Sequence, residues 1–175
     1  MRAVFISIVT LFIGAVGCGD RRDSGDSTGG TPTGGDADGI LADINLSHPS
    51  PKELGTDWVY SIGRRGPNSF GHCVNENYKN EKTGKSVSLT IQKLRTPSEA
   101  AELFEIKVAK FKSKPYSGLG QEARIEPRGS KRRPYVWICF RRANVIVFLD
   151  QIGKDYAAAM EVAKLIDKKI KVNLK

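Results

Sequence analysis

The sequence has little of what metal centres and common catalytic motifs need. Only three of its 175 residues are cysteine and two are histidine, and no Cys-x-x-Cys or His-x-x-x-His spacing occurs. Such spacings bring two ligands to one metal ion. Neither His48 nor His72 lies in a recognisable nucleophile motif. We therefore expect no metal, no cofactor and no catalytic residue.

A nucleotide site is also not expected. Residues 118–123 read Gly-Leu-Gly-Gln-Glu-Ala and superficially match a dinucleotide fingerprint. That fingerprint works only where a strand precedes it and a helix follows, because the helix N-terminus holds the phosphate. Here it follows a predicted helix, and the residues after it do not continue as an amphipathic helix.

The longest apolar run opens the chain. Arg2 precedes residues 3–16, whose length fits the core of about 7 to 15 residues of a secretory signal and is too short for a permanent membrane span. The run ends at Ala15-Val16-Gly17, and Cys18 follows. This arrangement resembles the bacterial lipobox, in which Cys18 is lipidated, the peptide is cut before it and the new N-terminus is acylated, for example with palmitate. Several acyl chains would make the anchoring stable; an ordinary signal peptide cleaved nearby is the alternative.

The residues after Cys18 predict a tether. Residues 19–39 are rich in Gly, Asp, Ser and Thr and contain no large apolar side chain. Such a segment cannot bury enough surface to offset its ordering entropy, and a reach of roughly 25 Å is expected for its length. We thus expect a signal peptide over residues 1–17, the lipidated cysteine and tether over 18–40, and one domain over 41–175. The expected location is the bacterial cell envelope, with the domain facing the periplasm or the exterior.

Periodicity within residues 41–175 predicts the fold class. Apolar and polar residues alternate over 86–94, which indicates a strand with one buried face. Further strands are predicted at 56–62, 70–78, 122–126, 135–140 and 145–149, with a turn at 66–68. The main helices are predicted at 97–112, opened by a capping box in which Glu99 reaches back to the Thr96 amide, and at 155–171. The order of strands, helix, strands and helix predicts an α+β fold, an antiparallel sheet of five or six strands with two main helices packed against it.

Four segments share their order and composition with a known group of domains. They read Leu-Gly-Thr-Asp-Trp at 54–58, Thr-Pro-Ser-Glu-Ala-Ala at 96–101, Gly-Leu-Gly-Gln-Glu-Ala at 118–123 and Val-Trp-Ile-Cys-Phe-Arg-Arg-Ala-Asn-Val-Ile-Val-Phe at 136–148. This progression resembles the small extracytoplasmic PsbP-like domains of bacterial lipoproteins and sensor ectodomains, over nearly all of residues 41–175. The resemblance implies a binding or assembly module. It assigns a functional role to no residue here.

The two remaining cysteines, Cys73 and Cys139, each lie in a predicted strand. Export would place them where disulfides persist, and a bridge between them would close a long loop. The alternative is two buried free thiols that behave as small apolar residues.

Basic residues are the strongest hint of a partner. Residues 1–40 carry three arginines against five aspartates, so the formal +9 of the chain leaves +11 on residues 41–175. The candidate anion-binding residues occupy one loop and one hairpin turn, and they are Arg128, Lys131, Arg132, Arg133, Arg141 and Arg142; Arg64 and Arg65 are expected in another turn. Gathered at one end of the sheet, these turns would bind phosphates or carboxylates; the alternative is that they are simply solvated. In the last predicted helix, residues 155–171, the apolar side is expected to face the sheet. The lysines on its other side are expected to face outward, and they are Lys164, Lys168, Lys169 and Lys171.

These observations favour a lipid-anchored, non-enzymatic cell-envelope domain for binding or assembly, attached to the membrane through its lipid and contacting an anionic partner through the basic loops. An exported domain does not meet intracellular nucleic acid. Anionic lipid headgroups, lipopolysaccharide phosphates, cell-wall polymers and an acidic protein remain as partners. The alternatives are an envelope hydrolase or redox enzyme with a cryptic site that uses a histidine or Cys139, and a structural subunit without a ligand.

Overall fold

The computed structural model describes residues 40–68, 71–130, 134–153 and 155–175. The predicted signal peptide, Cys18, the tether up to residue 39, and Lys131, Arg132 and Arg133 lie outside the described residues. The described elements are, in chain order, η1 (Ile44–Leu46), α1 (Pro51–Leu54), β1 (Trp58–Asn68), β2 (Gly71–Asn80), β3 (Ser86–Lys93), α2 (Pro97–Val108), β4 (Lys114–Pro115), β5 (Glu122–Gly129), β6 (Pro134–Arg142), β7 (Val145–Ile152) and α3 (Ala157–Asn173).

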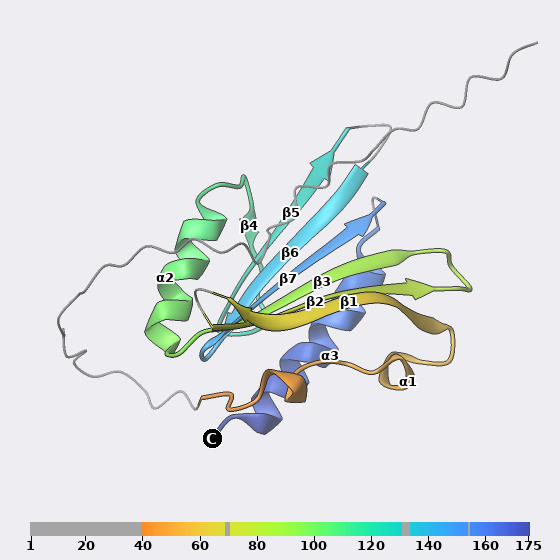
Figure 1. Ribbon diagram of the computed structural model, residues 1–175. Coiled ribbons are helices and arrows are strands. Elements are labelled where there is room, and N and C mark those ends of the chain that lie inside the picture. The colour runs from red at the N-terminus through yellow and green to blue at the C-terminus, as the bar shows by residue number, and fades with distance from the viewer. Residues whose placement is uncertain (1–39, 69–70, 131–133, 154) are drawn as a thin grey trace, which may run out of the picture.

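The described strands form one seven-stranded antiparallel sheet in the order β1-β2-β3-β7-β6-β5-β4 (Figure 1). The predicted α+β class with an antiparallel sheet is confirmed. The sheet has one strand more than the upper bound expected, because the two-residue β4 extends the edge beside β5. The third helix is α1, which has four residues.

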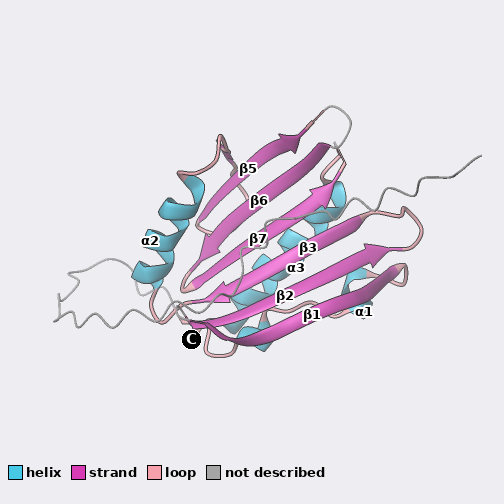
Figure 2. Cartoon of the chain, turned by 45° about the horizontal axis from the view of Figure 1, so that its top comes forward, coloured by secondary structure: helices cyan, strands magenta, loops and turns pink. Residues whose placement is uncertain are grey.

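The two faces of the sheet are covered differently. Helix α3 packs against β6 and β7 on one face, together with η1 and α1, and closes the larger apolar core. Helix α2 packs on the other face against the same two strands, where Trp137, Cys139, Ile146 and Phe148 meet it. In Figure 2, α3 lies behind the sheet and α2 stands at one side of it. Successive side chains of β6 and β7 point to opposite faces of the sheet, and a helix covers each face. Both faces of these strands are therefore buried, which explains their continuous apolar sequence.

The start of α2 matches the predicted capping box except for the donor to the Glu99 carboxylate. The Glu99 amide donates to Thr96 Oγ1 at 3.1 Å, and Pro97 occupies the first helical position. The Glu99 carboxylate accepts from the Arg95 amide at 3.0 Å, whereas the Thr96 amide was expected as its donor. The helix ends at Val108, four residues earlier than expected.

The edge strands differ most from expectation. The expected turn at residues 66–68 lies within β1, which is longer than predicted and pairs with β2 through Asn68. Proline lacks an N–H group and so sits in a sheet mainly at an edge strand, and β1 is an edge strand. Pro115 belongs to β4 at the opposite edge.

The segment before α1, residues 40–50, crosses the α3 face and is called the strap below. Its first residues are held by the fully buried Asn144 in the β6–β7 hairpin, whose side chain accepts from the Leu41 amide and donates to the Leu94 carbonyl, both at 2.8 Å. The Ile40 amide donates to the Lys175 carbonyl at 2.9 Å, and Leu41 and Leu174 form a β-bridge. The point where the tether would join the domain therefore lies beside the end of α3.

Candidate functional site

The two described cysteines, Cys73 and Cys139, are both buried and are not joined by a disulfide, so the predicted Cys73–Cys139 bridge is corrected. Cys73 lies on β2 and Cys139 on β6, with β3 and β7 between these strands. Three strand spacings of about 4.8 Å separate them by roughly 14 Å or more, whereas a disulfide requires Cα atoms within about 7 Å. Burial raises the pKa of the Cys139 thiol well above its usual value, which disfavours the reactive thiolate.

The basic loops do not gather at one end of the sheet. Gly129 pairs with Pro134 at one end of β5 and β6, and residues 131–133 fall between these two partners. Arg141 and Arg142 lie at the other end of β6, about 25 Å away along the strand at roughly 3.3 Å per residue. Arg64 and Arg65, expected in a turn, lie within β1. The described backbone therefore places Arg128 at the opposite end of β5 and β6 from Arg141 and Arg142, against the expectation of one combined surface for these three residues. The candidates Lys131, Arg132 and Arg133 lie outside the described residues.

Arg141 and Arg142 are engaged within the fold. Arg142 holds Asp167 of α3 in a two-pronged ion pair, with Nε 2.5 Å from Oδ1 and Nη2 3.0 Å from Oδ2, and Nη2 also donates to the Gly120 carbonyl at 3.2 Å. Arg141 donates from Nε to Glu122 at 2.9 Å and from Nη1 to Gln121 at 3.1 Å. A guanidinium whose fork is filled by a carboxylate has few donors left for a second anion. These two residues join β6 to α3 and β5.

A buried polar cluster that the sequence did not indicate lies under the strap. The Tyr78 hydroxyl is 3.0 Å from His48 Nδ1 and 2.8 Å from the Pro49 carbonyl oxygen, and it contacts the Glu76 carboxylate, which also contacts His48 Nδ1. The side chain of Glu76 is fully covered and that of Tyr78 is buried, while His48 keeps 19% exposure. A carboxylate and an imidazole in contact can exchange a proton, but here the strap covers the carboxylate. The cluster fixes the strap to β2.

The cationic feature that the described structure does place on one surface is a row of lysines along α3. Buried residues of α3 face β6 and β7, and the opposite side of the helix carries three exposed lysines at intervals of four and three residues, followed by a fourth exposed lysine four residues later. This row, called the lysine stripe, consists of Lys164, Lys168, Lys171 and Lys175. Lys164, Lys168 and Lys171, at intervals of four and three residues, share one side of α3. Lys175 lies just beyond the helix and is held by its backbone pairing with Ile40.

The stripe differs from Asp167 and Lys169 of α3, which both form ion pairs with other elements. Among the described residues, none of its four side chains forms an ion pair or a hydrogen bond. Lys169, which the sequence grouped with these lysines, instead binds Glu53 of α1, with Nζ 2.7 and 2.9 Å from the two carboxylate oxygens. Asp167 is taken by Arg142. Glu161, an exposed acidic residue of α3, lies three residues before Lys164, at the N-terminal end of the stripe.

This arrangement costs stability in the free domain. Like charges three or four residues apart on a helix destabilise it by about 0.2–0.5 kcal/mol per pair, and the stripe contains two such steps within α3, Lys164–Lys168 and Lys168–Lys171. Lys171 in the last turn recovers part of this cost through the helix dipole. An anionic partner laid along α3 would relieve the repulsion and form charge-assisted contacts. The row is therefore suited to bind phosphate or carboxylate groups.

Among the described residues, no helix combines the length and the apolarity needed to cross a membrane. In the same residues, no three side chains of the types His, Cys, Asp and Glu gather closely enough to hold a metal ion.

Comparisons with known proteins leave the family of this chain open. The sequence matches no model of a protein family and no curated protein. A solved structure that it resembles is the extracellular domain of PknH from Mycobacterium tuberculosis, with a TM-score of 0.47 and 12% identical residues, covering 73% of this chain and 94% of that chain. A similarity of this size carries no function or ligand from one chain to the other.

Proposed function

We propose that the protein is a lipid-anchored, non-enzymatic domain of the bacterial cell envelope that binds an anionic partner through the lysine stripe of α3. The observation that carries the proposal is the stripe itself: two like-charged steps on one face of α3 and a fourth exposed lysine just beyond the helix, none of them in an ion pair or a hydrogen bond with a described residue. The membrane anchor rests on the sequence before and including Cys18.

The position of the partner site differs from the one that the sequence favoured. Arg141 and Arg142 are held by Glu122 and Asp167 and stabilise the fold. On β5, the backbone of Arg128 pairs with Tyr135, at the opposite end of β6 from Arg141 and Arg142. The stripe needs no rearrangement to meet an anion, because its side chains are already exposed.

Two features support a binding role over the alternative of an envelope hydrolase or redox enzyme. Cys139 is buried with a raised pKa, which is the opposite of what a redox or nucleophilic thiol needs. Glu76 and Tyr78, which surround His48, are covered by the strap. A substrate would reach that cluster only if the strap moved away.

The anion site is tested by retention of the purified protein on phosphocellulose, a matrix that offers phosphate without any lipid or protein. Two variants each remove four positive charges from exposed lysines. The stripe variant is Lys164→Gln, Lys168→Gln, Lys171→Gln and Lys175→Gln. The control variant is Lys79→Gln, Lys82→Gln, Lys110→Gln and Lys112→Gln, on β2, the following turn and the segment after α2.

We expect the stripe variant to elute at clearly lower salt than the control variant, which should stay close to the unsubstituted protein. Equal displacement of both variants would mean that only the net charge matters, and the proposed site would be rejected. The anchor is tested separately by Cys18→Ser, which should move the protein out of the detergent phase in a phase-partition assay. Retention of that variant in the detergent phase would reject the anchor.

A further inference from the structure

Large apolar side chains are exposed around the point where the tether would join the domain. Val172 on the last turn of α3 is 74% exposed, Ile40 at the start of the strap is 44% exposed, and Leu46 of η1 is 41% exposed. We call these three residues the root patch.

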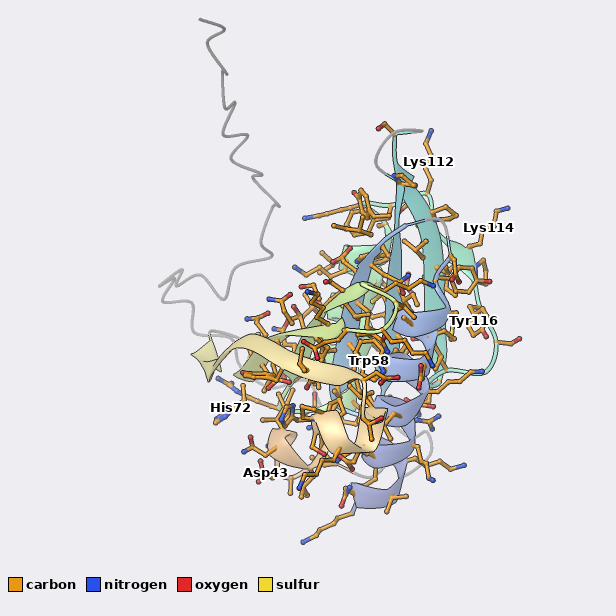
Figure 3. All side chains as sticks on the ribbon, turned by 90° about the vertical axis from the view of Figure 1, so that its right-hand side faces the viewer. Asp43, Trp58, His72, Lys112, Lys114 and Tyr116 are labelled. Atoms are coloured by element: carbon orange, nitrogen blue, oxygen red, sulfur yellow. The ribbon has the colours of Figure 1, made fainter. Side chains whose placement is uncertain are left out.

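The three residues come from segments that the fold brings together. Ile40 and Lys175 exchange two backbone hydrogen bonds, of 2.9 and 3.3 Å, three residues beyond Val172. The 3-10 helix that carries Leu46 packs against α3. Figure 1 shows the strap and the end of α3 together at the bottom of the molecule, beside the C-terminus. In Figure 3, Asp43 of the strap is likewise at the bottom, whereas Lys112 and Lys114 are at the top.

The root patch continues the lysine stripe. Val172 directly follows Lys171 and lies four residues after Lys168, so it belongs to the same side of α3. A further cation, Lys93, lies at the strap, where its ammonium donates to the Ala42 carbonyl. The nearby acidic side chain on the strap is Asp43, which accepts from the Asn45 amide at 2.9 Å. Apolar side chains beside several lysines are the combination that binds the interface of an anionic bilayer.

The place where the chain leaves the described domain favours a bilayer over an acidic protein. If Cys18 is lipidated, the 21 residues between Cys18 and Ile40 can span at most about 75 Å, whatever their conformation. That chain enters the domain at Ile40, within the root patch, so this end of the domain is the part tied most directly to the lipid. With the lipid anchor as the first attachment, the contact between the domain and the bilayer becomes intramolecular. A face that binds lipid only weakly can then stay bound.

We infer that the lysine stripe and the root patch form one docking face that lays the end of α3 on the anionic lipid headgroups of the membrane holding the anchor. This inference rests on the proposed function, since it names the anionic partner of the same stripe. Each lysine near an anionic surface strengthens binding about fivefold, so four of them contribute on the order of several hundredfold. Neutral lipid should therefore leave the domain undocked.

The test uses the full lipidated protein in lipid nanodiscs, either of phosphatidylcholine alone or with added phosphatidylglycerol. Because the native thiols Cys73 and Cys139 are buried and Cys18 would be acylated, a thiol-reactive polarity probe can be placed at Val172→Cys. A matched probe at Asn77→Cys marks an exposed position on β2, facing away from α3. The same probes are then read in the stripe variant and in the control variant.

The expected result is a blue shift of the Val172→Cys probe only in the phosphatidylglycerol discs, which high salt reverses and the stripe variant abolishes, while the control variant keeps it. The Asn77→Cys probe should not respond. An equal response of the two probes, or no difference between the two lipids, would overturn the inference.

The same data separate this inference from the proposed function. If the stripe is needed for phosphocellulose retention but the Val172→Cys probe ignores anionic lipid, the anion site stands and the lipid is not its partner. If the probe shifts only after an acidic envelope protein is added, that protein is the partner and lipid docking is wrong. If the stripe matters in neither assay, both proposals fail.

Discussion

Arg142 and Lys168 offer a direct contrast between a structural cation and a binding cation. Each would lose one positive charge as Arg142→Gln or Lys168→Gln, so bulk electrostatics predicts the same result for both. The structure predicts opposite results. Arg142 is engaged with Asp167 and Gly120, whereas Lys168 is exposed between Lys164 and Lys171.

The magnitude for Arg142→Gln follows from the burial of the pair. The side chains of Arg142 and Asp167 are 19% and 14% exposed, which lies between a surface pair worth about 0–1 kcal/mol and a fully buried one whose disruption costs about 3–5 kcal/mol. We expect a loss of about 2 kcal/mol in the free energy of unfolding. For the roughly 135 residues from 40 to 175 and an unfolding entropy of about 2.1 cal/mol/K per residue, this lowers the Tm by about 7 °C.

Lys168→Gln should act in the other direction. It removes two like-charge steps of about 0.2–0.5 kcal/mol each, and glutamine has nearly the helix propensity of lysine. The Tm should stay unchanged or rise by about 1–3 °C, while retention on phosphocellulose falls. Thermal unfolding by circular dichroism and the elution salt give both quantities for each variant.

The reasoning is refuted if Arg142→Gln melts like the unsubstituted protein and weakens retention as much as Lys168→Gln does. Arg142→Lys serves as the control for charge alone. It keeps the positive charge but loses the fork that grips both oxygens of Asp167, so its Tm should fall and its retention should be preserved.

Other predictions concern residues that hold the domain together. Glu53 has its pKa lowered to about 2, first by the hydrogen bond from Lys169 and then by the Ser50 amide; the pair therefore stabilises the fold above pH 4.5 and loses this contribution as the pH falls toward 2. Since the Glu53 side chain is 41% exposed, we expect only about 0.5–1 kcal/mol, and Lys169→Met should lower the Tm at pH 7 but not at pH 2. Both Cys73 and Cys139 should resist alkylation in the native protein and react fully in denaturant without a reductant; a non-reducing mass two hydrogens short would contradict the corrected assignment. Gly120→Ala should lower the free energy of unfolding by about 2 kcal/mol or more, since its φ is +57° and an added Cβ would lie 2.2 Å from the Arg141 carbonyl oxygen; an unchanged urea midpoint would contradict that geometry.

Local sequence signals predicted much of the fold. The alternation over 86–94 corresponds to β3, and the two apolar runs after residue 134 correspond to β6 and β7. Their hydrophobic periods are read from neighbouring residues alone. The turn expected at residues 66–68 is instead part of the edge strand β1, because Pro67, without an N–H group, suits a turn and an edge strand equally well.

Contacts between distant residues could not be predicted in this way. The separation of Cys73 from Cys139 depends on β3 and β7 lying between their strands, and strand order is a property of the whole sheet. The pairing of Arg142 with Asp167, 25 residues away, likewise depends on how α3 crosses β6.

The lysine stripe was partly visible in the sequence. Helical spacing placed Lys164, Lys168, Lys169 and Lys171 on the outside of the last helix, as they are found. Only the fold separates Lys169, which binds Glu53 from a segment 116 residues away, from the lysines that keep no partner among the described residues. Only the fold adds Lys175, through its pairing with Ile40.

The central claim, that α3 presents a specific anion-binding surface, is tested most directly by the salt dependence of binding to a soluble polyphosphate. Each lysine that contacts a phosphate releases bound counterions, so the slope of log K against log salt reports how many lysines take part. We predict that the stripe variant binds weakly with a much shallower slope, while the control variant, with the same net charge, keeps the slope of the unsubstituted protein. Equal slopes for the two variants would contradict the account.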